Sequence, residues 1–339
     1  MIDAAAVWEH LDSLAKPRRS LGRLEETAVR LATIQGTLRP LVRPRRLVLF
    51  AADHGVVARG VSSWPSEVTG LMVGTILAGR ATSSALAAAR ECSVRLVDVG
   101  VASPPPRSPP EFFRNARIAP GTQDLSQTPA MTSAQFDSAW NIGAEEAQRA
   151  VAEGNAVLIA GEMGIGNTTP AACLTMLLTE LPAEIAVGRG AGADDAVFAT
   201  KRKIVTEAAE RATPLLERDA RAAIASVAGF EIAAMAGFFA AGAQRGATLL
   251  VDGYVTTAAA LIAERLQPGV ARSMIAAHRS AESGHSVALA HLGLEPLLDW
   301  GMRLGEGTGA LVALPLLDSA AALLRDVAAL SDLGVARED

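Results

Sequence analysis

The sequence predicts an α/β fold in which helices cover both faces of a mostly parallel, Rossmann-like sheet. Apolar runs that close near a glycine or an acidic residue alternate with helix-compatible stretches, as in a parallel sheet buried on both faces. The runs that we expect to be strands are residues 46–55, 94–101, 156–162 and 247–253. Ligands bind such sheets at the carboxyl ends of the strands, and the polar residues that fall there are Asp53, His54, Asp98, Glu162 and Asp252.

The two ends of the chain have helical patterns and lack strand-like runs. We therefore expect them to pack together as a smaller helical layer. The predicted division is a large α/β domain of residues 38–317 and a small helical domain formed by residues 1–37 and 318–339. Within the large domain, the Pro-rich stretch at 102–112 is predicted to be a loop.

Composition argues against several function classes. Half of the 339 residues are apolar, and the formal net charge is −5 with no dominant basic patch, which argues against a nucleic-acid partner. The isolated Cys92 and Cys173 suit neither a disulfide framework nor a zinc site. The N-terminus lacks the pattern of a signal peptide, and aspartates interrupt the longest apolar segments, which makes them poor membrane spans. We therefore expect a cytoplasmic protein without a membrane span.

A glycine-rich stretch, AVLIAGEMGIGNTTPAACLTMLL at residues 156–178, joins a predicted strand to a predicted helix. A strand, a glycine loop and a helix start offer backbone N–H groups to a phosphate, and Pro170 suits the beginning of that helix. The alternative is that Thr168 or Thr169 only caps the helix. Glu162 lies beside the loop, where its charge would repel a phosphate that came close.

A second glycine-dense turn, VGRGAG at residues 187–192, is also a candidate anion site. It contains Arg189 and is followed by Lys203, and lysine is rare in this chain. The alternative is that its glycines are only turn residues. Neither glycine turn matches a Walker A loop or GxGxxG.

Three further segments carry candidate functional side chains. In ADHGVVARGVSSWPSEVT, Asp53 is a candidate orienting acid, and Trp64 could stack on a flat ligand or cover an apolar surface patch. His54 could equally be a core histidine. In HRSAESGHSVALAHLGL the three histidines are irregularly spaced, so we expect no metal, and the serines could be helix caps. In GMRLGEGTGA, Glu306 is either a solvated turn residue or a base whose pKa an apolar neighbour raises.

Taken together, the motifs resemble those of the nicotinate-nucleotide:dimethylbenzimidazole phosphoribosyltransferase family. The segments that carry the resemblance are SLGRLE, DHGVVARGVSSWPSEVT, PAMT, AGEMGIGNTTPAA, GRGAG, GFEIAAMAG, VDGYVTTAAAL, SAESGH and LGLEPLLDWGMRLGEGTGA. The resemblance implies transfer of 5-phosphoribosyl from nicotinate mononucleotide to 5,6-dimethylbenzimidazole or a related base. The products would be α-ribazole 5′-phosphate and nicotinate, in assembly of the cobalamin nucleotide loop. It also implies a homodimer that needs no metal and no other cofactor.

The resemblance assigns roles to residues in these motifs. Glu306 would be the general base, and Glu162 would face the ribose hydroxyls or the cationic C1′ region, away from the phosphate. The phosphoribosyl group would be bound by Gly164, Gly166, Asn167, Thr168, Gly188, Arg189, Gly190, Lys203 and Ser280. The accepting base would be bound by Asp53, His54, Ser63, Trp64, Leu71, Met163, Leu304 and Gly305.

This sequence departs from the family pattern at a few positions. It reads KPRRSLGRLE, with Arg18 and Arg19 where the family usually has Pro and Gly. Trp64 stands where tyrosine is common, and Leu71 where glutamine is frequent, so we expect tolerance of several apolar benzimidazoles and of phenolic bases. Two alternatives remain: transfer to a different lower-ligand base (another benzimidazole, a purine or a phenol), and a non-catalytic nucleotide-binding relative.

Overall fold

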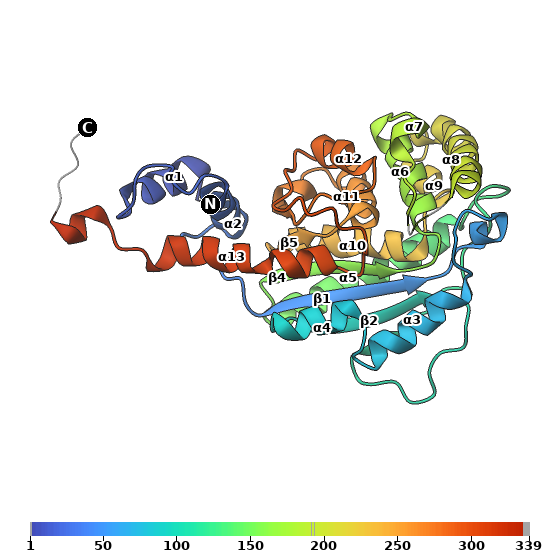
Figure 1. Cartoon of the computed structure of the whole chain (residues 1–339), viewed down its shortest axis with the longest axis horizontal. Helices are drawn as coiled ribbons and strands as arrows, with labels where there is room; N and C mark the ends of the chain where they lie inside the picture. The colour runs from blue at the N-terminus through green and yellow to red at the C-terminus, as the bar shows by residue number, and fades with distance from the viewer. Residues whose placement is uncertain (1, 191, 193, 335–339) are drawn as a thin grey trace.

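A computed structural model describes residues 2–190, 192 and 194–334 of the chain. In this part of the chain six strands form one parallel sheet in the order β3-β2-β1-β4-β5-β6 (Figure 1). The strands are β1 (Arg45–Ala52), β2 (Ser93–Gly100), β3 (Phe113–Asn115), β4 (Val157–Met163), β5 (Thr248–Val251) and β6 (Met274–Ala276). The predicted parallel α/β fold is therefore confirmed.

The four predicted strands correspond to β1, β2, β4 and β5. The sequence missed the two edge strands, β3 and β6, because each has only three residues and such short runs carry no periodicity. The Pro-rich stretch at 102–112 contains neither helix nor strand, as predicted, and it leads directly into β3.

Helices cover both faces of the sheet because side chains alternate between the faces along each strand. In β1, Val48 and Phe50 point into one apolar core, and Leu47 and Leu49 point into the other. The first core is closed by α5 (Ser133–Ala152), α6 (Thr168–Thr179), α7 (Ala183–Ala186), α8 (Asp195–Leu216), α9 (Ala220–Ala225), α10 (Phe230–Gln244), α11 (Tyr254–Leu266) and α12 (His285–His291). The second is closed by α1 (Ala4–Ser13), α2 (Arg23–Gln35), α3 (Glu67–Leu77), α4 (Thr82–Ala89) and α13 (Thr308–Asp326).

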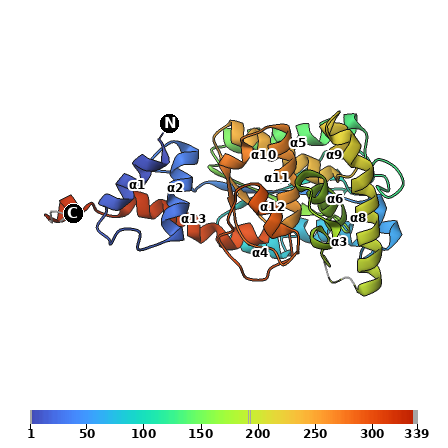
Figure 2. The same cartoon turned by 90° about the horizontal axis from the view of Figure 1, so that it is seen from above.

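The two chain ends meet on α13, to one side of the sheet (Figures 1 and 2). Helices α1 and α2 pack there, and a β-bridge joins Leu14 to Ala329. Because α13 is continuous from Thr308 to Asp326, one helix crosses the predicted domain boundary at residue 317. The division into two domains stays a prediction, and its residues 1 and 335–339 lie outside the described residues.

Among the residues that the structure describes, two segments are long and apolar enough to cross a membrane by length and composition alone. One is α13, which belongs to the second core and has 61% of its apolar window buried. The other, Glu67–Ala89, consists of α3 and α4 with a turn at Gly79 between them, and only 28% of its window is buried. The core position of α13 accounts for its apolar character, whereas the α3–α4 segment leaves an apolar face exposed.

Candidate active site

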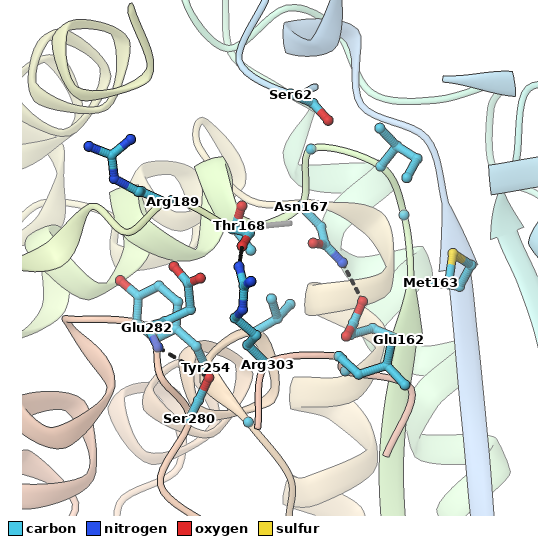
Figure 3. A pocket seen from close by; sticks show the side chains of 18 of the residues that line it. Ser62, Glu162, Met163, Asn167, Thr168, Arg189, Tyr254, Ser280, Glu282 and Arg303 are labelled. Atoms are coloured by element: carbon cyan, nitrogen blue, oxygen red, sulfur yellow. Dashed lines mark hydrogen bonds between the residues drawn. The ribbon is translucent and has the colours of Figure 1, made fainter. Parts of the chain in front are cut away.

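A pocket of about 150 Å³ opens at the carboxyl ends of the strands. In the strand order 3-2-1-4-5-6 the chain reverses its direction of travel across the sheet between β1 and β4, and open α/β sheets bind ligands at such a point. Six segments of the chain and the side chain of Lys201 line the pocket (Figure 3). The segments are residues 61–64, 162–168, 189–190, 252–256, 278–282 (through His278, Ser280 and Glu282) and 303–305.

The glycine loop after β4 packs tightly against the end of β1. A Cβ on Gly164 would clash with the carbonyl oxygen of Ala52, and Gly166 has a left-handed φ of 84°. The backbone N–H of Ile165 donates to Thr69 Oγ1 at 3.1 Å. These contacts explain why the loop needs glycine, and they fix its backbone at the rim of the pocket.

Thr168 begins α6, two residues before the predicted start at Pro170. Its hydroxyl does not cap the helix but accepts a hydrogen bond from Lys201 Nζ at 2.8 Å. Asn167, which precedes the helix, donates instead to Glu162 Oε2, as the dashed line in Figure 3 shows. The polar residues of this loop therefore connect the two charged ends of the pocket.

Lys201 is the buried cation of the site. It is only 1% exposed, and its Nζ also donates to the carbonyl oxygen of Gly188 at 3.0 Å. Burial lowers the pKa of this amine to about 8, and the Glu282 carboxylate opposes that change. Gly188 itself does not line the pocket, but a Cβ there would clash with Glu282.

Lys203, which the sequence analysis assigned to the phosphoribosyl group, lies on the exposed side of α8. It is exposed and 4.0 Å from Glu207, one helical turn away, and it does not line the pocket. Two residues along a helix correspond to a rotation of about 200°. The apolar pattern of α8 could have identified the lysine that lines the pocket, because Lys201 shares a face with the buried Ile204 and Ala208.

Two arginines complete the cationic end of the pocket. Arg303, which the sequence argument did not single out, donates to the carbonyl oxygen of Gly190 at 3.1 Å. Arg189 pairs with Asp195, and its guanidinium lies 5.1 Å from the centre of the Phe198 ring. Figure 3 shows Arg189 and Glu162 at opposite sides of the pocket.

Buried carboxylates form the other end. Burial raises the pKa of Glu162 well above its usual value; the hydrogen bond from Asn167 opposes the rise, and nearby carboxylates add to it. Burial also raises the pKa of Asp252, although His278 opposes this from 3.7 Å. Asp252 Oδ1 accepts from the backbone N–H of Ala310 at 2.9 Å, which ties β5 to the start of α13.

The Glu306 turn is pressed onto the end of β4. Gly305, Glu306 and Gly307 have left-handed φ values of 88°, 56° and 72°, and a side chain in that region costs about 1–2 kcal/mol. A Cβ on Gly161 would lie 2.8 Å from the Glu306 carbonyl carbon, and one on Gly307 would lie 2.6 Å from Leu47 Cδ1. The turn therefore requires glycine on both sides of a strained glutamate.

Glu306 is 2% exposed and, unlike the preceding Gly305, does not line the pocket. Its Oε2 accepts a hydrogen bond from Ser83 Oγ at 2.6 Å. Its backbone N–H points to Glu162 Oε1 at 3.4 Å. The two predicted catalytic carboxylates are thus neighbours, held by different elements.

Comparisons with known proteins show the family to which the chain belongs. A family model described as phosphoribosyltransferase matches residues 3–335. The chain belongs to this phosphoribosyltransferase family. A relative from Thermus thermophilus, named nicotinate-nucleotide--dimethylbenzimidazole phosphoribosyltransferase, is 45% identical over 96% of each chain. One of the same name from Cupriavidus taiwanensis is 44% identical over 96% of this chain and 93% of its own. The crystal structure of CobT from Thermus thermophilus superposes with a TM-score of 0.94, at 44% identity over 99% of both chains.

Most of the phosphoribosyl-binding residues that the family resemblance assigned meet in the pocket. Those that line it are Gly164, Gly166, Asn167, Thr168, Arg189, Gly190 and Ser280. On the base side, the lining contains Ser63, Trp64, Met163, Leu304 and Gly305. Trp64 and Leu304 are half or more exposed, so this end of the pocket is open and apolar.

Three residues predicted to bind the base lie elsewhere. Leu71 is 70% exposed on α3 and does not reach the pocket lining. Asp53 and His54 are buried, and Asp53 Oδ2 accepts from the Ala102 N–H at 2.8 Å. His54 Nε2 lies 3.0 Å from Glu231 Oε1; burial opposes its charge, yet Glu231 and Asp53 raise its pKa above the usual value. His54 therefore packs under Gly164 of the glycine loop and Asp53 holds the segment after β2, and neither lines the pocket.

In the histidine-rich segment, His278 lines the pocket, whereas His285 is held in the interior by hydrogen bonds. His285 Nε2 is 2.9 Å from Thr257 Oγ1, and its Nδ1 accepts from the Ser280 N–H at 2.7 Å. Burial lowers the pKa of His285 to about 3, so it stays neutral and holds Ser280 at the pocket. Across residues 2–190, 192 and 194–334, no three His, Cys, Asp or Glu residues come together as metal ligands.

Proposed function

We propose that the protein transfers the 5-phosphoribosyl group of nicotinate mononucleotide to 5,6-dimethylbenzimidazole or a related base. The observation that carries this proposal is one pocket with a cationic end, a buried carboxylate end and an open apolar mouth. Nicotinate mononucleotide has a phosphate and a cationic pyridinium ring on opposite sides of its ribose. The names of the relatives point to the same substrates.

The phosphate would bind at the cationic end. Lys201, Arg189 and Arg303 supply positive charge there, and the glycine turns supply backbone N–H groups. Glu162 lies across the pocket, so distance avoids the repulsion that its place beside the glycine loop suggests. We propose that it faces the ribose and C1′.

The chemistry requires charge stabilisation more than acid catalysis. The C1′–N bond to nicotinate breaks with its electron pair moving to the ring nitrogen, so the pyridinium leaves as a neutral ring without receiving a proton. Positive charge develops on the ribose, as in glycosyl transfer generally. Glu162 and Asp252, ionised next to that charge, would stabilise it more in the transition state than in the substrate.

The accepting base must lose a proton. One benzimidazole nitrogen forms the new bond to C1′, and the N–H proton of the other passes to a base. We propose Glu306 as that base, since it follows the pocket-lining Gly305 in the chain and its backbone N–H lies 3.4 Å from Oε1 of the pocket-lining Glu162. A general base contributes about 10²–10⁴-fold to the rate.

The test is nicotinate release from nicotinate mononucleotide, with and without 5,6-dimethylbenzimidazole, by the wild type and Glu306→Gln. We expect release that depends on the base and that falls by about 10²–10⁴-fold in kcat in the variant. Release without any base would indicate hydrolysis and contradict the proposal. Absence of release with every benzimidazole, purine and phenol tried would favour a non-catalytic nucleotide-binding role.

We further propose a homodimer, in the cytoplasm, that buries the exposed face of α3. This helix is apolar but mostly uncovered in the single chain, and Leu71 on it is 70% exposed. A Cβ on Gly74, also on α3, would meet nothing within 4 Å, so Gly74→Arg adds charge to the face without a clash inside the chain. Sedimentation velocity should show a dimer for the wild type and a monomer for the variant; a monomeric wild type would contradict the proposal.

A further inference from the structure

Ser83 is a buried hydroxyl on α4 that touches the proposed base. It is 0% exposed, and its Oγ donates to Glu306 Oε2 at 2.6 Å from 223 residues away in the chain. In the described part of the chain, no other side chain forms a hydrogen bond with this carboxylate. The second oxygen, Oε1, accepts no hydrogen bond from the described residues.

The backbone of Glu306 is fixed by its neighbours, but its side chain is not. The left-handed turn and the close approaches of Gly161 and Gly307 determine where the Glu306 Cα lies. A glutamate has three rotatable side-chain bonds beyond that atom, and a general base works only within hydrogen-bond reach of its proton. The Ser83 hydroxyl is the group that selects one carboxylate orientation.

We propose that Ser83 is a positioning residue, which holds Glu306 Oε2 so that Oε1 receives the proton of the accepting base. The inference rests on the proposed role of Glu306. Ser83 itself does not touch substrate, since it is 0% exposed and lies outside the pocket lining. Its hydrogen bond also gives a buried carboxylate oxygen the partner that burial demands.

The neighbouring Ser84 provides a matched control. Its hydroxyl donates to the carbonyl oxygen of Ile76 at 3.5 Å, within the α3–α4 unit and not toward Glu306. Ser83→Ala and Ser84→Ala are the same substitution one residue apart on one helix. Alanine favours helix, so neither change should unfold α4.

The experiment measures kcat and KM for nicotinate release in the wild type, Ser83→Ala, Ser84→Ala, Ser83→Thr and Glu306→Gln. Losing a hydrogen bond to a charged group should lower kcat about 10- to 100-fold in Ser83→Ala. The KM for nicotinate mononucleotide should not change, because the phosphate end is untouched. Ser83→Thr, which keeps the hydroxyl, should recover activity, and Ser84→Ala should match the wild type.

The double variant Ser83→Ala/Glu306→Gln distinguishes positioning from structural damage. If Ser83 acts through Glu306, the alanine adds no further loss of kcat to Glu306→Gln, whereas a packing defect multiplies the two losses. Equal kcat in Ser83→Ala and Ser84→Ala, or multiplied losses in the double variant, would overturn the inference and leave the proposed function standing. Full activity of Glu306→Gln would overturn both the base assignment and the inference. A wild type without base-dependent release would overturn the proposed function itself.

Discussion

The two ends of the pocket bear side chains of opposite charge, yet burial favours the neutral form of both. At the cationic end it lowers the pKa of Lys201 to about 8. At the other end it raises the pKa of Glu162 well above the usual range. Both changes favour the neutral form, because surroundings of low polarity disfavour charge of either sign.

Because burial disfavours the charge at both ends, a substrate that restores both charges would be recognised by the whole pocket. A phosphate beside Lys201 favours the protonated amine, and a cationic ring or ribose beside Glu162 favours the ionised carboxylate. Nicotinate mononucleotide offers both, so under the proposed function it would strengthen the charge at each end. A ligand with only one of the two groups would engage only one end.

The largest effect on the binding of nicotinate mononucleotide is expected at the cationic end. Lys201→Met should raise the KM for nicotinate mononucleotide about 10- to 100-fold, since a hydrogen bond between charged groups is lost. Lys203→Met, two residues along the same helix but exposed, should leave KM unchanged. Steady-state kinetics of both variants compare the two lysines directly. A higher KM in Lys203→Met, with an unchanged KM in Lys201→Met, would contradict this prediction and support Lys203 as the lysine that binds the phosphate.

A second prediction concerns pH at the same end. Below pH 8 the Lys201 amine is charged, and above pH 8 it progressively loses its proton. The KM for nicotinate mononucleotide should therefore rise as the pH increases through 8, and this rise should be absent in Lys201→Met. A pH-independent KM in the wild type would show that the amine does not meet the phosphate.

At the carboxylate end, one substitution should raise the stability of the fold and lower the activity. The folded-state pKa of Glu162 lies above its usual value of 4.5. As the pH rises above that value, the unfolded chain releases this proton more readily than the folded chain, so the folded state loses stability. Glu162→Gln removes this effect and should raise Tm more at pH 8 than at pH 5, while it lowers kcat. A Tm gain that is equal at both pH values would contradict the direction of the shift.

The smallest effect is expected at the apolar mouth. Leu304→Gln changes a residue of the pocket lining, whereas Leu71→Gln changes one that lies outside the lining of the single chain. Competition between 5,6-dimethylbenzimidazole and a phenolic base should reveal a clear change of preference for Leu304→Gln and a change of about two- to threefold for Leu71→Gln. Unchanged preference in both variants would place the base elsewhere.

The sequence predicted those features that local pattern determines. The longer strands are visible as apolar runs, and the glycines around Glu306 indicate a turn that only they can form. From the sequence we chose Lys203, although the helical spacing of the buried residues of α8 places Lys201 on the buried face of that helix. Asp53 and His54 were predicted to lie at the end of a strand, and they do. Their sequence neighbours do not show that His54 pairs with Glu231 on α10, which is far away in the chain. Ser83 could not be predicted from the sequence, because a serine in a helix is common and only folding brings this one to Glu306.

The most direct test of the two-ended pocket is the number of protons exchanged on ligand binding. Calorimetric titration at a series of pH values from 5 to 8, in two buffers with different heats of ionisation, gives that number for ribose 5-phosphate and for nicotinate mononucleotide. We predict that ribose 5-phosphate takes up protons near pH 8 as Lys201 becomes fully charged. Nicotinate mononucleotide should take up fewer protons than ribose 5-phosphate at those pH values where the raised pKa of Glu162 keeps this carboxyl protonated in the free protein. In Glu162→Gln the two ligands should take up the same number. Identical proton uptake by both ligands in the wild type would contradict the assignment of Glu162 to the cationic part of the substrate.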